Sequence, residues 1–223
     1  MLDFKNITKI YKNDLNYNKV LDNINITINN NEISLIRGNS GVGKSTLLNI
    51  IGCLLIPNEG KVYCDGLMFD LSKDDITNFR INNFAYVFQD YNLLPEFNVH
   101  ENLLLPSYIN NIDINKTEKK IDTLLDYMNI SYLKKSYPSS ISHGEKQRVS
   151  ILRSLLGKQK IILADEPTGN LDEINTKNIL DLIANINKDL NYTFIIASHD
   201  KNFISIAHNV YNIKNKKINK YNE

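Results

Sequence analysis

The chain has 223 residues, of which 42% are hydrophobic and 23% are charged, and its formal net charge at pH 7 is +1. This length supports one sizeable core, or one core with a smaller lobe, and the composition excludes a largely disordered chain. The charge gives neither a basic field to indicate nucleic acid nor an acidic field to argue against a membrane surface. Cys53 and Cys64 show neither zinc-ligand clustering nor a disulfide framework. No apolar run reaches the length of a membrane span, and the first residues lack a signal peptide's hydrophobic block, so a cytosolic location is expected.

The N-terminal segment alternates apolar and polar residues in two blocks. These blocks, Phe4–Tyr11 and Val20–Ile28, flank the polar segment Lys12–Lys19. Alternation of this kind on both sides of a polar stretch predicts a β-hairpin.

A glycine-rich loop follows a short apolar run, Glu32–Ile36, and precedes a helix-forming one, Leu47–Ile51. Glycines let successive backbone N–H groups converge on one anion, and the following helix adds the positive end of its dipole. The loop fits the pattern G-x-x-x-x-G-K-[ST], in which Lys44 reaches the β and γ phosphates and Ser45 holds Mg²⁺. A chance glycine-rich turn is the alternative, but the full pattern and its context disfavour it. The predicted nucleotide-binding residues of this phosphate loop are Gly38, Asn39, Ser40, Gly41, Val42, Gly43, Lys44, Ser45 and Thr46.

The rest of the chain alternates strand-like and helix-like segments. Short apolar runs predict strands at Gly60–Gly66, Phe84–Phe88, Lys160–Ala164 and Tyr192–Ala197. Apolar residues at helical spacing predict helices within 99–135, from Ser142 onward and across Ile174–Asn187. We expect Gly60–Gly66 to join the hairpin in an antiparallel subsheet and the other strands to form a mostly parallel sheet. The predicted fold is α/β, with a helical insertion at about residues 90–158.

Asp165 and Glu166 follow the strand predicted at Lys160–Ala164. Two adjacent carboxylates at a strand end can take two different roles. Asp165 would bind Mg²⁺ through water, and Glu166 would polarise the attacking water. An isolated Asp-Glu pair at a strand end is commonly just a solvated pair without a catalytic role. In a chain that also has a complete phosphate loop, the catalytic interpretation is favoured over this one.

These motifs resemble those of the ABC-transporter nucleotide-binding subunits over essentially the whole chain. The family's order is Tyr11, the phosphate loop, Gln89, the signature Ile141–Arg148, Asp165–Glu166, Gly169–Asp172 and His199. The resemblance implies a single ATPase domain over 1–223, built on a P-loop nucleotide triphosphatase core with a mostly parallel sheet. The RecA-like core, together with an antiparallel β subdomain, is expected to span about 1–89 and 159–223. A helical subdomain is expected at about 90–158.

The resemblance also implies a role for each motif. Tyr11 stacks on adenine, although a tyrosine at a strand end is more often simple packing. Gln89 contacts Mg²⁺ and the attacking water, and His199 hydrogen-bonds the γ-phosphate, although a lone histidine is usually a surface or satisfied core residue. The implied catalytic residues are Glu166, His199, Gln89 and Lys44. The implied metal ligands are Ser45, Gln89 and Asp165, and the further nucleotide contacts are Ser142, Gly144, Glu145 and Asp172.

The signature departs from the family's usual S-G-G, because His143 stands at the first glycine. If that position requires a positive φ, a histidine there is strained; otherwise the imidazole lies at the dimer seam. Ser142 and Gly144 are kept, so we expect a working composite site, and His143→Gly should leave turnover unchanged or raise it. A second departure is Asn31, where many relatives have glycine, and asparagine tolerates the left-handed conformation.

The resemblance is strongest to the lipoprotein-releasing, macrolide-exporting, peptide-exporting and cell-division ATPases. It implies that two copies sandwich two MgATP molecules, and that closure drives a separate membrane subunit. That subunit is expected to dock on an exposed apolar surface near Tyr91, Leu93, Leu94 and Phe97.

The expected function is therefore ATP binding and hydrolysis coupled to lipoprotein release or to peptide or drug export. ATP and Mg²⁺ are the expected cofactors, nucleic acid is not an expected partner, and the chain should lie on the cytosolic face of a membrane through its partner. Two alternatives stay open: a cell-division-type or regulatory ATPase with weak hydrolysis, and an ABC protein without a transport role.

Overall fold

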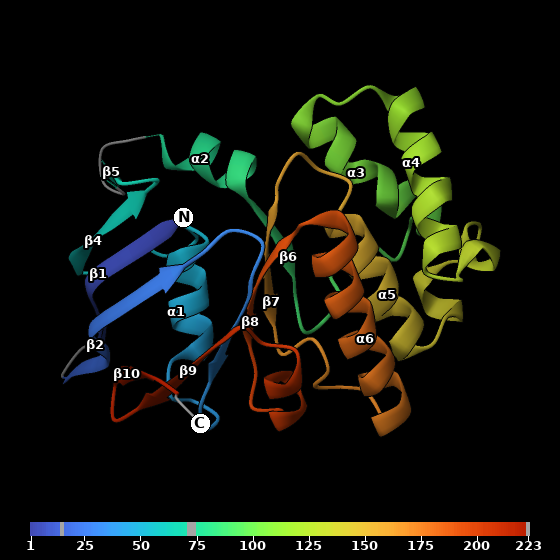
Figure 1. Ribbon diagram of the computed structural model, residues 1–223. Coiled ribbons are helices and arrows are strands. Elements are labelled where there is room, and N and C mark those ends of the chain that lie inside the picture. The colour runs from blue at the N-terminus through green and yellow to red at the C-terminus, as the bar shows by residue number, and fades with distance from the viewer. Residues whose placement is uncertain (14–15, 71–74, 222–223) are drawn as a thin grey trace.

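The computed structural model describes residues 1–13, 16–70 and 75–221, whose strands form two sheets flanked by helices (Figure 1). The strands are β1 (Leu2–Asn13), β2 (Asn16–Ile28), β3 (Ile33–Arg37), β4 (Glu59–Cys64), β5 (Leu67–Phe69), β6 (Phe84–Val87), β7 (Ile161–Asp165), β8 (Thr193–Ala197), β9 (Asn209–Lys214) and β10 (Lys217–Lys220). The helices are α1 (Lys44–Ile51), α2 (Ile76–Asn83), α3 (Val99–Asn110), α4 (Ile114–Tyr127), α5 (His143–Ser154) and α6 (Glu173–Leu190). Short 3₁₀ turns lie at Ser131–Leu133, Pro138–Ser140 and Lys201–Ser205.

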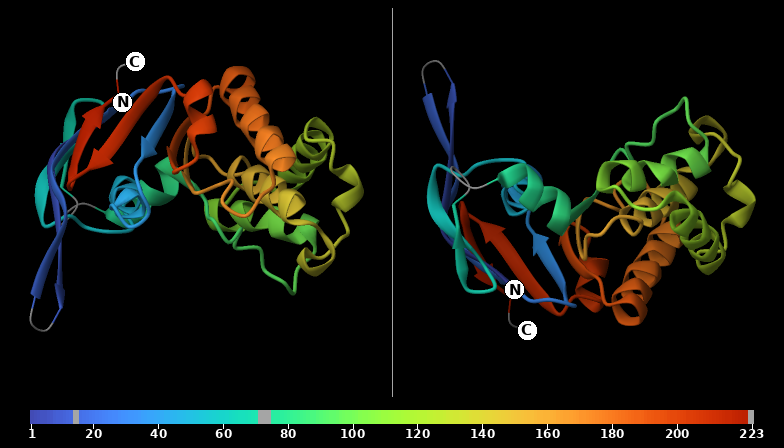
Figure 2. Two further views of the ribbon diagram at one scale, coloured as in Figure 1. Left: turned by 90° about the horizontal axis from the view of Figure 1, so that it is seen from below. Right: turned by 90° about the horizontal axis from the view of Figure 1, so that it is seen from above.

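The smaller sheet has the order β2-β1-β4-β5 in the described part of the chain, and its pairings are antiparallel. The pairing of β1 with β2 runs from Leu2 opposite Ile28 to Asn13 opposite Asn16. The predicted hairpin is confirmed and is longer than its apolar blocks, and it projects beyond the body of the molecule (Figure 2). Residues 14–15 of the predicted polar segment lie outside the described residues.

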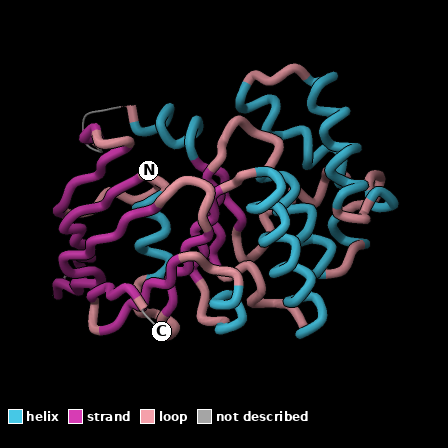
Figure 3. Tube along the Cα trace, in the orientation of Figure 1, coloured by secondary structure: helices cyan, strands magenta, loops and turns pink. Residues whose placement is uncertain are grey.

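The larger sheet has the order β10-β9-β3-β8-β7-β6 over the same residues. Figure 3 colours the strands of both sheets magenta. Pairing is parallel from β9 to β6 and antiparallel only at β10, which confirms the mostly parallel sheet. This order brings the carboxyl ends of β3, β8, β7 and β6 side by side. Open α/β sheets bind their ligands at this edge.

Successive residues of the central strands pack into two separate cores. Leu35 and Phe194 lie in the core that includes residues of α3, α4, α5 and α6. Their neighbours Ile36 and Ile195 point the other way, into the core formed with α1 and the smaller sheet. Because side chains alternate along a strand, burial on both faces produces the continuous apolar runs seen in the sequence. The phosphate-loop helix α1 is consequently held between the two sheets (Figure 1).

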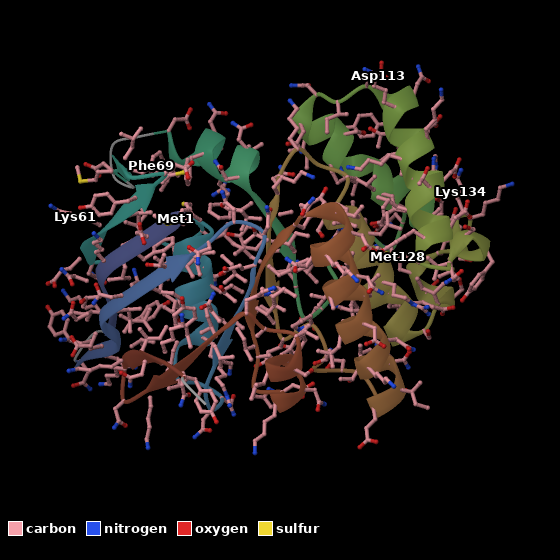
Figure 4. All side chains as sticks on the ribbon, viewed as in Figure 1. Met1, Lys61, Phe69, Asp113, Met128 and Lys134 are labelled. Atoms are coloured by element: carbon pink, nitrogen blue, oxygen red, sulfur yellow. The ribbon has the colours of Figure 1, made fainter. Side chains whose placement is uncertain are left out.

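The predicted helices are present, and the region 99–135 is divided into α3 and α4. Each begins at its own N-cap, since Asn98 accepts a hydrogen bond from the Glu101 N–H and Asp113 accepts one from the Lys116 N–H. Figure 4 labels Met128, which follows α4 and is buried in the helical core. Among the described residues no helix has the length and apolar character needed to span a bilayer.

The sequence did not predict α2, β5, β9 or β10. Helix α2 contains no buried residue and therefore shows no apolar stripe. Aromatic contacts hold it in place, because the Phe79 ring stacks on Phe69 at a centroid distance of 4.1 Å and meets Phe84 edge-on at 5.9 Å. Phe69, labelled in Figure 4, closes the end of the smaller sheet.

The turn before β3, where Asn31 stands in place of the family's usual glycine, forms as expected. Asn31 has a φ of 59°, in the left-handed region. Its N–H donates to Thr193 Oγ1 at 2.8 Å, and its carbonyl oxygen accepts from Asn187 Nδ2 at 3.1 Å. Asparagine therefore keeps the turn that leads into β3.

Candidate active site

The phosphate loop between β3 and α1 folds as its glycines predict. Gly38, Gly41 and Gly43 have φ values of 154°, 75° and 107°, which residues with side chains rarely adopt. Gly43 is the N-cap of α1 and supplies no side chain to the first N–H groups of the helix. These donors are available to an anion.

Lys44, the first residue of α1, is 6% exposed. Its Nζ donates to the carbonyl oxygens of Gly38 at 3.1 Å and Asn39 at 3.3 Å. It also lies 3.2 Å from Glu166 Oε1. A buried charge requires partners of this kind, so the loop and the carboxylate together hold the ammonium at the centre of the site.

Ser45 and Asp165 form the second pair. Ser45 Oγ donates to Asp165 Oδ1 at 3.0 Å, which joins the start of α1 to the end of β7. Burial raises the pKa of Asp165, an effect that Glu166 reinforces and that Ser45 and Lys44 oppose. A hydroxyl beside a carboxylate provides the hard oxygen ligands that Mg²⁺ takes, commonly together with substrate phosphates, so these residues fit the predicted metal.

Glu166 is held in an unusual backbone conformation, with a φ of 44°. A residue with a side chain is strained there by about 1–3 kcal/mol. Its N–H donates to the Ala197 carbonyl at 2.8 Å, and its Oε2 accepts from Ser198 Oγ at 2.9 Å. Burial would raise the pKa of Glu166, but hydrogen bonds from His199, Ser198 and Lys44 outweigh it and lower the pKa. The strained turn thus aims an ionised carboxylate at Lys44.

His199 and Gln89 occupy different positions relative to this carboxylate. His199 Nδ1 lies 2.9 Å from Glu166 Oε2, and its exposed ring extends from the carboxyl end of β8. An ionised carboxylate accepts, so Nδ1 carries the proton. Gln89 is exposed after β6, and its Nε2 lies 3.4 Å from where a Cβ on Gly169 would stand. The structure therefore brings Lys44, Ser45, Asp165, Glu166 and His199 together. It places Gln89 beside Gly169, in the loop that follows Glu166.

The signature residues form the N-terminus of α5. Ser142 is the N-cap, and it forms a capping box with Glu145: each backbone N–H donates to the other side chain. Tyr132 Oη also donates to Glu145 Oε1 at 2.6 Å, and this bond, followed by that from Ser142, lowers the pKa of Glu145. His143 is the first helical residue, so its backbone is right-handed. The alternative of a strained histidine is therefore wrong.

Comparisons with known proteins agree with this geometry. The profile of the family described as "ABC transporter" matches residues 21–169, most of the chain. This chain belongs to the ABC transporter family.

Individual relatives cover nearly the whole chain. The lipoprotein-releasing system ATP-binding protein LolD of Buchnera aphidicola subsp. Schizaphis graminum is 37% identical over 94% of this chain and 92% of its own. The putative hemin import ATP-binding protein HrtA of Staphylococcus haemolyticus is 37% identical over 97% of this chain and 98% of its own.

The dimeric structure of the ABC transporter cassette MJ0796, of Methanocaldococcus jannaschii, matches with a TM-score of 0.87 and 33% identity over 100% of both chains. A dimeric post-hydrolysis state of MJ0796 bound to ADP and Pi matches with a TM-score of 0.86. The fold is therefore the ABC ATPase cassette.

Tyr11 of this ABC cassette lies on the projecting hairpin. Its ring is 39% exposed, and it stands opposite Asn18 in the β1–β2 pairing. The same hairpin packs against the phosphate loop, because a Cβ on Gly43 would lie 2.9 Å from Val20 Cγ1. The role of Tyr11 toward adenine stays a prediction.

Gly144 and Asp172 are linked through α6. A Cβ on Gly144 would lie 2.5 Å from Asn175 Oδ1, so the signature helix approaches α6 closely there. Asp172, the N-cap of α6, accepts hydrogen bonds at 2.8 Å from both the N–H and the Nδ2 of Asn175. The structure thus assigns Asp172 a capping role and leaves its contact with nucleotide a prediction.

The predicted docking surface requires one correction. Tyr91 is only 8% exposed, because its ring packs beside His143 and its hydroxyl hydrogen-bonds that imidazole. Leu93 is half-buried, whereas Leu94 and Phe97 are 42% and 38% exposed. The expectation of exposed apolar area is therefore wrong for Tyr91.

Sequence reasoning missed Ser198 and Val20. Ser198 orients Glu166, and the sequence signal was its place between the apolar run and His199. Val20 closes the hairpin onto the loop through a contact that no spacing in the sequence marks.

Proposed function

We propose that this chain is the ATP-binding and ATP-hydrolysing subunit of an ABC transporter. The meeting of Lys44, Ser45, Asp165, Glu166 and His199 at the carboxyl ends of neighbouring strands carries the proposal. The cassette MJ0796, solved in a post-hydrolysis state with ADP and Pi, supports it as a structural relative. The domain organisation we propose is one ATPase domain, with the helical subdomain at about 90–158.

The chemistry follows from the pairing of Lys44 with Glu166. Phosphates of ATP would take the place of Glu166 Oε1 at the Lys44 ammonium, with the loop N–H groups around them. Released from Lys44, Oε1 can accept the proton of the attacking water, while Ser198 and His199 still hold Oε2. The water oxygen bonds to the γ-phosphorus as the bond to the ADP oxygen breaks. Ser45 and Asp165, with Gln89 as a further ligand, would hold Mg²⁺, which neutralises phosphate charge when bound.

The nucleotide site is proposed to be completed by a second copy of this chain. Ser142 is exposed at the N-terminus of α5, and Gly144 follows one residue after His143. A helix N-terminus attracts anions, so it suits the γ-phosphate of ATP bound to the phosphate loop of the other copy. The dimeric form of MJ0796 supports this arrangement.

The membrane partner is proposed to dock on the exposed Leu94 and Phe97, and to reach a groove of about 330 Å³ that these two residues do not line. Residues of α2, β6, α3 and the end of α5 line the groove, Phe88, Leu105 and Ile109 among them. Arg153 also lines it, and its guanidinium donates to the carbonyl oxygens of Tyr91 and Asn92. A cytosolic apolar segment of the permease seated there would act on the chain just after Gln89 and hold this subunit at the membrane.

The cargo we propose is that of the lipoprotein-releasing and peptide- or drug-exporting group. The similarity to LolD supports lipoprotein release, although HrtA, whose name states hemin import, is equally identical. The alternative of a weakly hydrolysing regulatory subunit supposes that His143 blunts catalysis. The helical backbone of His143 argues against backbone strain as the cause, and the turnover of the parent chain tests the alternative.

The experiment is the ATPase rate of the purified chain and of Glu166→Gln. We expect MgATP turnover in the parent and its loss in the variant. Glu118→Gln, at an exposed glutamate of α4, is the matched control and should keep the parent rate. A parent without turnover would contradict the proposal.

A further inference from the structure

His143, the signature residue that replaces glycine, has a specific partner. Its Nδ1 lies 3.1 Å from Tyr91 Oη, and the two ring centroids are 6.0 Å apart. Tyr91 is 8% exposed, whereas His143 is exposed at the helix end. A buried hydroxyl thus binds the inner nitrogen of a ring that solvent reaches.

The chemistry of the two groups fixes the direction of this hydrogen bond. A phenol O–H is a strong donor and an unprotonated imidazole nitrogen is a strong acceptor, so the Tyr91 hydroxyl donates its single proton to His143 Nδ1. A neutral imidazole that accepts at Nδ1 carries its own proton on Nε2.

The backbone around Tyr91 is fixed to the helix that carries His143. Tyr91 and Asn92 have φ values of 62° and 48°, both left-handed. The Tyr91 carbonyl oxygen accepts from Ser150 Oγ at 3.2 Å and from Arg153 Nη2 at 2.8 Å. Strained residues persist where their surroundings over-determine them, so Tyr91 is a rigid support for the imidazole.

We propose that the hydrogen bond from Tyr91 Oη to His143 Nδ1, called the relay below, presents the His143 Nε2–H as a hydrogen-bond donor to the γ-phosphate of ATP held by the second copy. Tyr91 is the positioning residue in this relay, and His143 is the residue that touches the nucleotide. The inference rests on the proposed ATP-bound dimer. It reverses the sequence-based expectation for His143→Gly, because the imidazole replaces the glycine with a donor.

The first test is the tautomer of His143, measured by two-bond ¹⁵N–¹H correlation NMR on ¹⁵N-histidine-labelled protein without nucleotide. The chain has 4 histidines, and His143→Gly assigns the signal. His208 is an internal reference, because its Nδ1 accepts from the Ile33 N–H at 3.0 Å. We expect the Nε2–H form at His143, and a shift toward a mixture of tautomers in Tyr91→Phe. An Nδ1–H form in the parent, or no change in Tyr91→Phe, would overturn the relay.

The second test is the ATP-driven dimerisation constant, measured in the Glu166→Gln background. Glutamine places an amide nitrogen near the position of Nε2, whereas asparagine places its amide near Nδ1. One hydrogen bond to a charged group corresponds to a change of about tenfold or somewhat more. We therefore expect His143→Gly and His143→Asn to weaken the dimer by about tenfold, Tyr91→Phe to weaken it less, and His143→Gln to stay within about threefold of the parent.

Two controls separate a phosphate contact from simple packing. His100→Gln and Tyr108→Phe, on α3 with Tyr108 59% exposed, should leave the dimer unchanged. If His143→Gly dimerises as tightly as the parent, the role of His143 is wrong although the dimer stands. If the Glu166→Gln parent does not dimerise with ATP, the proposed dimer fails as well, and the tautomer result still reports on the relay.

Discussion

The two halves of the proposed nucleotide site differ in how their polar groups are satisfied. In the phosphate-loop half, Lys44 is buried and paired with Glu166, and Ser45 is bonded to Asp165. In the signature half, Ser142 and His143 lie exposed at the end of a helix. The first half pairs its charged groups within one chain, whereas the second exposes a helix N-terminus and the His143 ring to solvent. Changes in the first half should therefore alter chemistry and binding, and changes in the second should alter assembly.

The largest expected effect is on turnover in Glu166→Gln. Loss of a general base lowers the rate by about 10²–10⁴-fold. ATP binding should be kept, because the neutral amide no longer competes with phosphate for Lys44. Steady-state ATPase assays and a nucleotide-binding titration measure both quantities. Loss of binding in parallel with turnover would contradict the separation of the two roles.

The next largest effect is on ATP affinity in Lys44→Ala. A hydrogen bond to a charged group contributes about 1.5–3 kcal/mol, so the affinity should fall by about 10- to 100-fold. Isothermal titration checks this, with Lys61→Ala on the exposed start of β4 as the matched control. Equal affinity in Lys44→Ala and the parent would show that phosphate does not replace Glu166 at this ammonium.

A smaller effect separates folding from assembly in Ser142→Ala. Removal of an N-cap side chain costs about 0.5–2 kcal/mol of stability. Asp113→Ala removes the cap of α4 and should cost a similar amount. Chemical denaturation should show similar losses in the two variants, whereas only Ser142→Ala should weaken ATP-driven dimerisation. Equal dimerisation in both would place the signature outside the seam.

The smallest effects are on the pH dependence of stability without nucleotide. Burial raises the pKa of Asp165 in the folded state, so its ionisation opposes folding above that pKa. Asp165→Asn should raise the melting temperature at neutral pH, and the gain should vanish below the ordinary value of 3.8. The lowered pKa of Glu166 has the opposite sign, so Glu166→Gln should lower stability at neutral pH and lose that effect in acid. Melting curves with the same sign for both variants would contradict this assignment.

The fold was largely predictable where burial shapes the sequence directly. Strands such as β8, with every residue buried, read as continuous apolar runs. In β9 the pattern is broken by Asn209, which is buried because its Nδ2 donates to Glu32 Oε2 at 2.6 Å. Helix α2 depends on the stacking of Phe79, which only the tertiary structure brings about.

The candidate site was predictable in its residue types and not in its pairings. The motifs gave Lys44 and Glu166 roles toward phosphate and water, but not the 3.2 Å contact between them. The strained φ of Glu166 depends on the neighbouring strand, which accepts its N–H. The sequence predicted Tyr91 at the surface. Its ring is buried because it packs beside His143, a contact with the signature helix that its position in the sequence does not indicate.

The central claim is that two copies complete one site around ATP. Sedimentation velocity of Glu166→Gln, with and without saturating MgATP, tests it most directly. We predict a monomer without nucleotide and a dimer with MgATP, and a return to monomer when Lys44→Ala is added. A monomer at saturating MgATP, with nucleotide binding shown in the same sample, would contradict the account.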